Sequence, residues 1–312
     1  MNFRHLQFFV TLARERHFGR AAAASCVTQP TLSEALQQLE RELAVPLIDR
    51  DRRRFRGLTS EGERVLAWAT RILSDQVAME QELAQLKGEL SGVLRLGVIP
   101  AAMPVVPFLT KEFCARYPKV KLKILSLSSI EIQRGLDSGE LAAGLTYLEN
   151  EPLTNVRTFR LYEERYLLLT PPGGPFSGRS EVTWREAGSL PMCLLTSGMQ
   201  NRRIIDRLFE DGGAQDVQVM VETDSILAQI THVCNGGWSS IVPHTFLTLL
   251  AYQQGAGHRP EAIPVTAPAR EHVVGLVTTN RDPLPPLARA LVEVTERLDV
   301  AAQLDRALGG VA

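Results

Sequence analysis

The chain has 312 residues, of which 45% are hydrophobic and 22% are charged, and its formal net charge is −1. This composition is ordinary for a folded protein in water, and the length allows two or three domains. The four cysteines stand far apart with no CxxC pair, which argues against a disulfide framework and a zinc site. No apolar stretch reaches the ~20 residues that span a bilayer, and no export signal opens the chain, so we expect a cytoplasmic protein without a membrane partner.

The charge is unevenly distributed along the chain. Residues 1–57 contain ten arginines, no lysine and six acidic residues, a net charge of +4, so the rest of the chain carries −5. A basic module on an acidic body favours a polyanionic partner for the N-terminus. A solvated basic face explains the same charge, so charge alone leaves both interpretations open.

Three short helices are predicted first. Residues 3–13 have apolar side chains three and four apart, residues 19–25 are rich in alanine, and Thr28 is a suitable N-cap for a third helix with Pro30 in its first turn. The third helix has an apolar stripe made of Leu32, Leu36, Leu39 and Leu43. The polar side chains off that stripe can face outward, and they are Gln29, Thr31, Ser33, Gln37 and Arg41.

A charged hairpin and a long helix follow. Residues 49–57 are too charged and too short for a core element, so they predict a wing beside the helices. Ser60 and Glu63 have the spacing of a capping box at the start of the long helix. Two rows of side chains then repeat every seven residues: Val65, Ile72, Met79 and Leu86, and Ala69, Gln76, Leu83 and Leu90. This period favours a dimer helix, the alternative being an amphipathic helix packed on its own domain.

Strands and helices alternate after residue 92. Strands are predicted at 93–99, 120–127, 141–147, 166–170, 192–195, 217–221, 239–242 and 272–278. Helices are predicted at 104–117, 130–138, 201–210 and 226–234, with one last helix over 286–307. Such alternation predicts an α/β domain with a parallel sheet covered by helices on both faces.

The N-terminal module has the chemistry of a DNA reader. The outward side chains of the third helix are short and polar, which suits base edges and phosphates in a major groove. Thr28 and Thr31 can hold a phosphate at the helix N-terminus, and Ser33 and Gln37 share one face. The predicted DNA contacts are Thr28, Gln29, Pro30, Thr31, Ser33, Gln37, Arg50, Arg52, Arg53 and Arg54. An ordinary three-helix module with an exposed polar face is the alternative.

Linked motifs in this region resemble one family. The segments 28–33 (TQPTLS), 39–43 (LEREL), 46–50 (PLIDR) and 58–62 (LTSEG) closely resemble the N-terminal signature of LysR-type transcription regulators. The order of the remaining elements is similar as well, so the resemblance covers nearly the whole chain. The chain departs from the family pattern at Ala44, where glycine is usual, at Ile48, where phenylalanine is usual, and at Gly57, which resembles an extra wing residue.

The resemblance implies a domain plan. It implies a winged helix-turn-helix at 1–58, a linker and dimerisation helix at 59–91, and a two-lobed effector domain at 92–312, built like periplasmic binding proteins. We place lobe 1 at about 92–164 and 270–305, and lobe 2 at about 165–269. The implied partners are double-stranded promoter DNA, a small-molecule effector, a second copy in a homodimer or homotetramer, and RNA polymerase. No cofactor and no metal are expected.

Effector contacts are expected at the cleft between the lobes, because ligands in such folds lie at the carboxyl ends of strands. Polar turns follow several predicted strands, and a helix start at 100–103 can present N–H groups to an anion. The expected contacts are Pro100, Ala101, Ala102, Met103, Ser128, Ser129, Thr146, Thr196, Gln200, Asn201, Arg203 and Asp224. Helix capping is the alternative for each serine or threonine, and solvation is the alternative for Arg202 and Arg203.

The effector itself is predicted to be a small carboxylate. Pro100, Ala101 and Ala102 stand where many LysR-type regulators carry serine or threonine, which indicates a small effector. The segments 57–59 and 199–203 resemble a subgroup found beside formate dehydrogenase genes, so formate is a candidate.

Three other classes of protein were weighed. No GxxxxGK[ST], GxGxxG, HExxH or GxSxG motif is present and the six histidines lack metal spacing, so we expect no enzyme. An enzyme or metabolite-binding protein with an accessory DNA-binding module is the alternative. A nonspecific architectural DNA protein would spread its basic charge along the chain, and an extracellular solute-binding protein would need an export signal.

Overall fold

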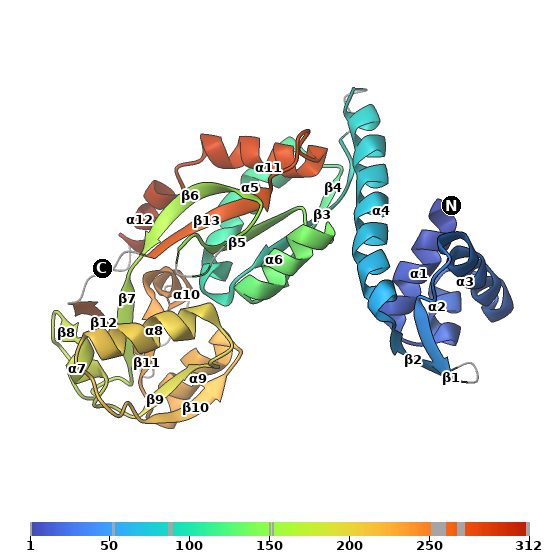
Figure 1. The fold of residues 1–312 in the computed structure, drawn as a ribbon. Helices are drawn as coiled ribbons and strands as arrows, with labels where there is room; N and C mark the ends of the chain where they lie inside the picture. Colours follow the sequence, from blue (N-terminus) through green and yellow to red (C-terminus); the bar gives the residue numbers. More distant parts are fainter. Residues whose placement is uncertain are drawn as a thin grey trace. The chain divides into compact units, whose positions relative to one another are not determined.

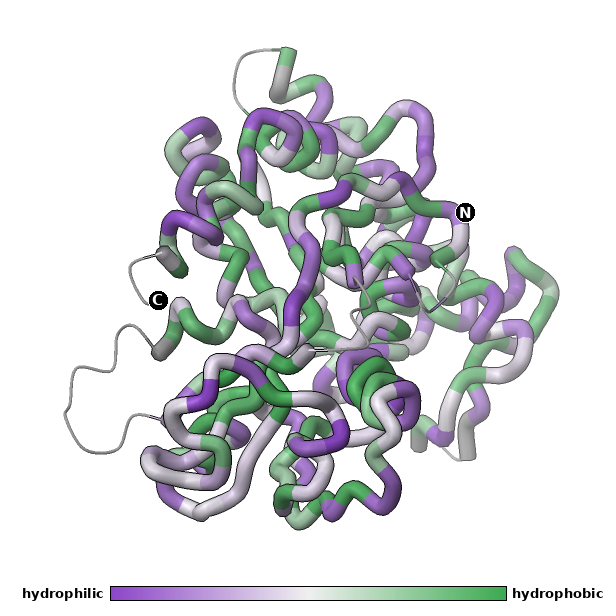
Figure 2. Tube along the Cα trace, turned by 90° about the vertical axis from the view of Figure 1, so that its left-hand side faces the viewer, coloured by the Kyte–Doolittle hydropathy of each residue, from purple (hydrophilic) through white to green (hydrophobic). Residues whose placement is uncertain are grey.

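A computed structural model describes residues 2–51, 54–86, 90–149, 151, 153–250, 260–266 and 272–309. The chain divides into two compact units, residues 1–90 with 137–140, and the remainder of 91–312. Figure 1 shows both units, and each is described by itself. Figure 2 shows hydrophobic and hydrophilic segments alternating along the chain, and no helix in the described ranges is long and apolar enough to cross a bilayer.

The N-terminal unit contains the three helices, hairpin and long helix that the sequence predicts. Its elements are α1 (Phe3–Glu15), α2 (Phe18–Ala24), α3 (Gln29–Leu43), β1 (Ile48–Asp51), β2 (Arg54–Leu58) and α4 (Ser60–Leu86). Phe9, Leu12, Leu32 and Leu39 are completely buried where α1 to α3 meet. The predicted leucine stripe of α3 is therefore the face that packs into this core.

The start of α4 differs from the predicted capping box. Thr59, rather than Ser60, is the cap: its Oγ1 accepts a hydrogen bond from the Gly62 N–H at 2.9 Å. The Ser60 hydroxyl instead donates to Glu61 at 2.9 Å. The predicted capping box of Ser60 and Glu63 is wrong because Ser60 is the first residue of the helix, and the N-cap is the residue before it.

The two seven-residue rows of α4 have different surroundings along its length. Val65, Ala69 and Ile72 pack on the core of the N-terminal unit, as the lone-helix alternative requires. Farther along the helix, Val77, Met79, Leu83 and Leu86 are exposed by 50% to 81%. Of the two predicted rows, Met79, Leu83 and Leu86 are therefore left uncovered in a single chain, whereas Leu90 lies beyond the end of α4 at Leu86 and is buried.

The C-terminal unit contains two lobes, each with its own sheet. The first sheet has strand order β4-β3-β5-β13-β6 and consists of β3 (Gly92–Val98), β4 (Val120–Ser126), β5 (Ala143–Tyr147), β6 (Val156–Glu164) and β13 (His272–Thr279). The second has order β11-β7-β12-β8 and consists of β7 (Tyr166–Thr170), β8 (Val182–Thr183), β11 (Ser240–Pro243) and β12 (Glu261–Thr266). A parallel pair, β9 (Met192–Leu195) and β10 (Val219–Thr223), is bridged to it between Met192 and Ser239.

Helices cover these sheets (Figure 1). They are η1 (Pro100–Val105), α5 (Val106–Arg116), α6 (Ser129–Ser138), α7 (Trp184–Ala187), α8 (Gln200–Asp211), α9 (Ile226–Gly236), η2 (His244–Phe246), α10 (Leu247–Leu250), α11 (Pro286–Arg297) and α12 (Val300–Leu308). The chain passes from the first sheet to the second between β6 and β7, and returns between β12 and β13.

Two predictions for this unit are wrong. The first sheet is mixed rather than parallel, because β13 returns from the second lobe and pairs antiparallel with both β5 and β6. The single last helix is two helices, because Leu298 is extended and the Asp299 side chain caps a new helix by accepting from the Ala302 N–H at 2.9 Å. Strands β6, β8 and β12 were not predicted; β6 contains Arg157, Arg160, Glu163 and Glu164, so it lacks the continuous apolar run of a buried strand.

Candidate nucleic-acid interface and effector cleft

The outward face of α3 carries the predicted DNA contacts. Thr28, Gln29, Pro30, Thr31 and Gln37 are exposed and Ser33 is half-buried. Thr28 caps the helix, with its Oγ1 2.8 Å from the Thr31 hydroxyl. Of the predicted arginines, Arg52 and Arg53 lie outside the described residues, and so do the side chains of Arg50 and Arg54 in the hairpin strands.

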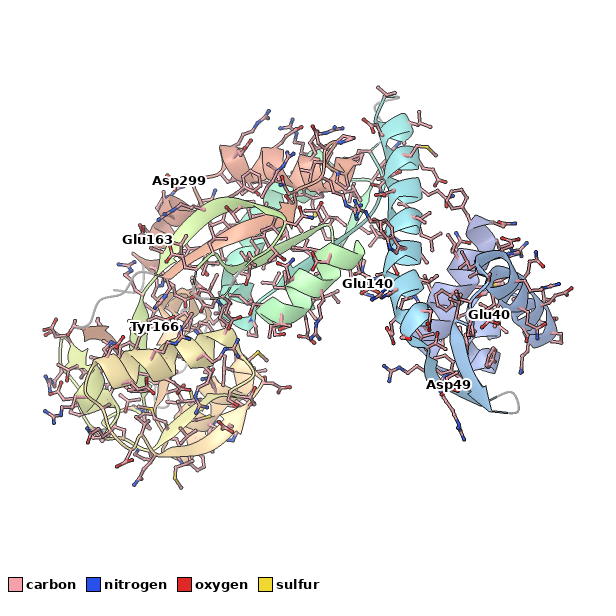
Figure 3. All side chains as sticks on the ribbon, viewed as in Figure 1. Glu40, Asp49, Glu140, Glu163, Tyr166 and Asp299 are labelled. Atoms are coloured by element: carbon pink, nitrogen blue, oxygen red, sulfur yellow. The ribbon has the colours of Figure 1, made fainter. Side chains whose placement is uncertain are left out.

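The hairpin is attached to the helices by the polar residues of the family motif. Glu40 Oε1 on α3 accepts hydrogen bonds from the backbone N–H groups of Leu47 at 2.9 Å and Ile48 at 3.3 Å. The Thr59 hydroxyl donates to the Pro46 carbonyl at 2.7 Å (Glu40 is labelled in Figure 3). These bonds fix β1 and the start of α4 against α3, so the hairpin has a defined place beside α3.

Each departure from the family pattern has a visible structural counterpart. Ala44 ends α3 with φ of 55°, in the left-handed region where glycine is the least strained residue. The hairpin register moves from Asp49–Gly57 to Arg50–Phe55, so Arg56 forms a bulge that takes up the extra wing residue. Ile48 is buried, as an apolar residue at that position should be.

A cleft of about 960 Å³ lies within the C-terminal unit and is lined from both lobes. Pro100, Met103 and Ser128 line it from the first lobe, and Asp224 lines it from the second. Met199, which was not predicted, lines it as well. Among the described residues, the lining contains two carboxylates, Glu131 and Asp224, and no arginine, lysine or histidine.

Several predicted contacts in the first lobe serve the protein's own structure. Ala101 and Ala102 are buried, and the Ala102 N–H donates to the Ile99 carbonyl inside a short 3₁₀ helix. The Ser128 N–H and hydroxyl both donate to Glu131 at 2.8 Å, and these bonds lower the pKa of the Glu131 carboxyl. Ser128 is thus a helix cap that also lines the cleft.

The predicted contacts of α8 are bound to the first lobe. Gln200 Nε2 donates to the Glu149 carbonyl at 3.0 Å, and Asn201 Nδ2 donates to the Tyr147 hydroxyl at 2.8 Å. Arg203 pairs with Glu151, which also accepts from the buried Ser129 hydroxyl at 2.9 Å. These three pairings join the lobes, and they give Arg203 a carboxylate partner inside the protein.

The remaining predicted effector contacts are not among the described residues that line the cleft. Thr146 Oγ1 and Gln200 Oε1 are buried atoms without a hydrogen-bond partner in the described part of the chain. Thr196 is half-buried at the turn before α8. Arg202, by contrast, is held within the second lobe by Asp206 at 2.8 Å and Glu222 at 2.6 Å.

A buried acidic residue at the crossover between the lobes escaped sequence reasoning. Glu164 ends β6, is 2% exposed and accepts a hydrogen bond from Tyr147 at 2.5 Å. Burial raises the pKa of Glu164 to about 7, against the opposing effect of the Tyr147 and Tyr166 hydroxyls. Nothing in the charged segment around it distinguishes this glutamate from its exposed neighbour Glu163, because only the tertiary fold buries it.

Comparisons with known proteins agree with this architecture. Residues 3–63 match the model described as "Bacterial regulatory helix-turn-helix protein, lysR family", and residues 87–299 match the "LysR substrate binding domain". A probable hydrogen peroxide-inducible genes activator of Streptomyces viridosporus is 30% identical over 80% of both chains. The dual regulator OxyR of Escherichia coli is 27% identical over 96% of both chains.

Solved structures show the same fold. A full-length OxyR variant from Pseudomonas aeruginosa matches with a TM-score of 0.76 and 26% identity over 97% of both chains. CbnR bound to its target DNA matches with a TM-score of 0.69 and 19% identity, covering 95% of this chain and 99% of that one. With both family models matched in chain order over most of its length, the chain belongs to the LysR family of bacterial transcription regulators.

Proposed function

We propose that the chain controls transcription by reading promoter DNA with α3 and by binding a small effector in the cleft between its lobes. The observation that carries the DNA half is the exposed polar face of α3, opposite a fully apolar core face and beside a hairpin fixed by Glu40 and Thr59. Thr28, Gln29, Pro30, Thr31, Ser33 and Gln37 are its contacts in the groove, with the wing arginines on the backbone. The domain plan stays as predicted, at 1–58, 59–91 and 92–312.

The functional form is a homo-oligomer. The exposed stripe of α4, Met79, Leu83 and Leu86, has helical spacing and needs an apolar partner. A second copy of α4 supplies one and pairs two DNA-reading modules, about 34 Å or a multiple of it apart. Effector binding shifts the packing of subunits and with it the access of RNA polymerase.

The cleft favours an effector without a negative charge. Its lining combines apolar side chains such as Met103, Phe108 and Leu249 with hydroxyls and two carboxylates. A buried anion needs a cationic or amide partner, and Arg203 is already paired with Glu151. Neither the lining nor the names of the relatives supports formate, so we replace the small carboxylate with an uncharged molecule that has an apolar body.

Peroxide sensing is a second candidate, favoured by the names of the relatives. All four cysteines are free thiols, and burial raises the pKa of Cys193 and Cys234. A raised pKa disfavours the reactive thiolate. None of the described residues that line the cleft is a cysteine.

One experiment separates these proposals. Promoter fragments selected from host DNA are footprinted with the full chain, alone and with a metabolite library, and hits are tested by thermal shift. We expect a discrete footprint altered by an uncharged ligand, and we expect that alteration to be lost when Ser128 in the cleft lining is replaced by alanine. A footprint altered by peroxide, and abolished by a Cys193→Ser or Cys234→Ser substitution, would favour the second candidate; protection without a discrete boundary would reject sequence-specific binding.

A further inference from the structure

A second cavity lies at the crossover between the lobes, and the effector proposal does not use it. It measures about 690 Å³ and is lined by β6, the start of β7, η2 and α12. Figure 3 labels Glu163 and Tyr166 on the strands that form this crossover. None of its lining residues lines the effector cleft, so the two are separate places.

The cavity holds buried polar atoms with unmet hydrogen bonds. Glu164 Oε2 and the Tyr162 hydroxyl have no hydrogen-bond partner in the described part of the chain, and both residues are at least 95% buried. The Tyr166 hydroxyl lies beside the same carboxyl without a hydrogen bond of ordinary geometry. Buried polar atoms of this kind normally have a partner, so three of them around one cavity point to an occupant.

Among the described residues, each arginine in the cavity lining is already paired with a carboxylate other than Glu164. Arg160 pairs with Glu163 at 3.0 Å, and Arg165 pairs with Asp305 at 3.3 Å. His244 supplies no charge, because burial lowers its pKa to about 4 and its Nδ1 accepts the Arg165 backbone N–H. A positive group is therefore the complement that the cavity lacks.

The walls suit an organic cation rather than a metal ion. Tyr162 packs edge-on to His244 with ring centroids 6.0 Å apart, and Tyr166 packs on Trp184 at 5.8 Å. Leu208 and Leu304 complete the lining with apolar surface. Aromatic rings around a carboxylate attract ammonium groups, while the hydroxyls accept their N–H donors.

We propose that this cavity is a second ligand site, which binds a small organic amine in its ammonium form through Glu164, Tyr162 and Tyr166. The site reaches the lobe interface through two hydrogen bonds, from Tyr147 to Glu164 at 2.5 Å and from Asn201 to Tyr147 at 2.8 Å. A cation that holds Glu164 ionised strengthens both bonds. Amine binding therefore stabilises the contact between β5 of the first lobe and α8 of the second.

The test is a calorimetric titration of the full chain with benzylammonium, benzyl alcohol and benzoate at pH 8. We expect one benzylammonium per chain with a dissociation constant below about 1 mM, and at least tenfold weaker binding of the other two. Glu164→Gln weakens benzylammonium at least tenfold. Tyr162→Phe, which removes no hydrogen bond within the protein, weakens it severalfold. The matched control Asp224→Asn, an acid-to-amide change in the effector cleft, leaves it unchanged.

The pH dependence gives an independent readout. Among the described residues, the titratable groups that act on the Glu164 carboxyl are Tyr147 on β5, Tyr162 on β6 and Tyr166 on β7. His272 on β13 is the register partner of Glu164, Arg165 is adjacent in sequence, and His244 on η2 packs against Tyr162. Since the carboxyl ionises near neutral pH when empty, affinity should rise about tenfold from pH 6 to pH 8. The proposal is overturned by undetectable benzylammonium binding, by equal binding of benzoate, or by loss of binding in Asp224→Asn with retention in Glu164→Gln.

Discussion

The two units of this chain use their polar side chains in opposite ways. In the N-terminal unit, Glu40 and Thr59 bind backbone groups seven to thirteen residues away, which leaves the outward side chains of α3 available to DNA. In the C-terminal unit, Asn201 and Arg203 are joined to partners more than fifty residues away on the other lobe. Local pairing fixes the hairpin beside α3, whereas distant pairing joins the two lobes of the C-terminal unit.

The largest expected effect tests the rigidity of the reader. A Cβ at Gly62 would lie 2.1 Å from the Leu47 carbonyl oxygen, where the hairpin meets α4. Gly62→Ala should destabilise the N-terminal unit by about 3 kcal/mol and abolish the footprint. The matched change Gly57→Ala meets nothing within 4 Å and should have almost no effect. Hydrogen exchange of α1 to α3 measures the stability of the N-terminal unit in each variant. Equal protection in Gly62→Ala and Gly57→Ala would contradict this prediction.

The next effect tests the crossover between the lobes through its two buried titratable groups, Glu164 and His244. The folded-state pKa of Glu164 is about 7, above its ordinary value, so its ionisation removes stability as pH rises from about 4.5 to 7. The folded-state pKa of His244 is about 4, below its ordinary value. The free energy of unfolding that it contributes therefore increases as pH rises from about 4 to 6.5. The two trends nearly cancel in the wild type.

Glu164→Gln removes one of those trends. The variant's stability in β6 and β7 should rise by about 3 kcal/mol between pH 4 and pH 7, while the wild type changes by less than about 1 kcal/mol. Hydrogen exchange of these strands at several pH values measures the difference. Parallel curves for the two proteins would show that Glu164 does not titrate in this range.

A smaller effect measures the ion pair that joins the lobes. Arg203 and Glu151 retain 33% and 26% of their side-chain exposure, so solvent screens their attraction. A double-mutant cycle with Arg203→Ala and Glu151→Gln should give a coupling of about 1 kcal/mol. Arg202→Ala, whose two carboxylate partners lie in the second lobe, should show no coupling to Glu151→Gln. Coupling of equal size for both arginines would argue against a specific joint.

The smallest effect has the opposite sign. Ala44 holds a left-handed conformation at the end of α3, so Ala44→Gly should stabilise the N-terminal unit by up to about 1 kcal/mol. The same chemical change at Ala23, an exposed position inside α2, should destabilise it by about 1 kcal/mol. Thermal unfolding of the two variants checks the pair. A loss of stability at Ala44 would mean that its backbone conformation has been misassigned.

The contrast between the units also explains what the sequence could predict. The helices and hairpin of the reader follow from short-range signals: the leucine stripe of α3, the Thr28 cap and a charged hairpin. The motif residues Glu40 and Thr59 form hydrogen bonds with residues nearby in the sequence, so their positions in the fold can be predicted from their spacing in the sequence. The local errors are small: the Ser60 cap is shifted by a single residue, and Leu90 lies beyond the end of α4 at Leu86.

The effector domain was less predictable because its decisive contacts are long-range. The order of strands in the first sheet depends on β13, which follows the whole second lobe in the sequence and then pairs with β5 and β6 of the first lobe. Residues such as Gln200 and Asn201 were expected to face a ligand, and their polarity gave no sign that Glu149 and Tyr147 would bind them. The sequence around Glu164 contains several charged residues, and nothing in it distinguishes the buried Glu164 from the exposed Glu163.

The most direct test of DNA reading by α3 compares two adjacent glutamines. Gln37 is exposed on the proposed reading face, while Gln38 donates to Glu42 along the helix at 3.0 Å. Binding of each alanine variant to the selected promoter is measured against unrelated DNA at physiological salt. Gln37→Ala should lose about 1 to 3 kcal/mol of specific binding and Gln38→Ala almost none. Equal loss in both variants, or unchanged specific binding in Gln37→Ala, would contradict the assignment of α3 as the recognition helix.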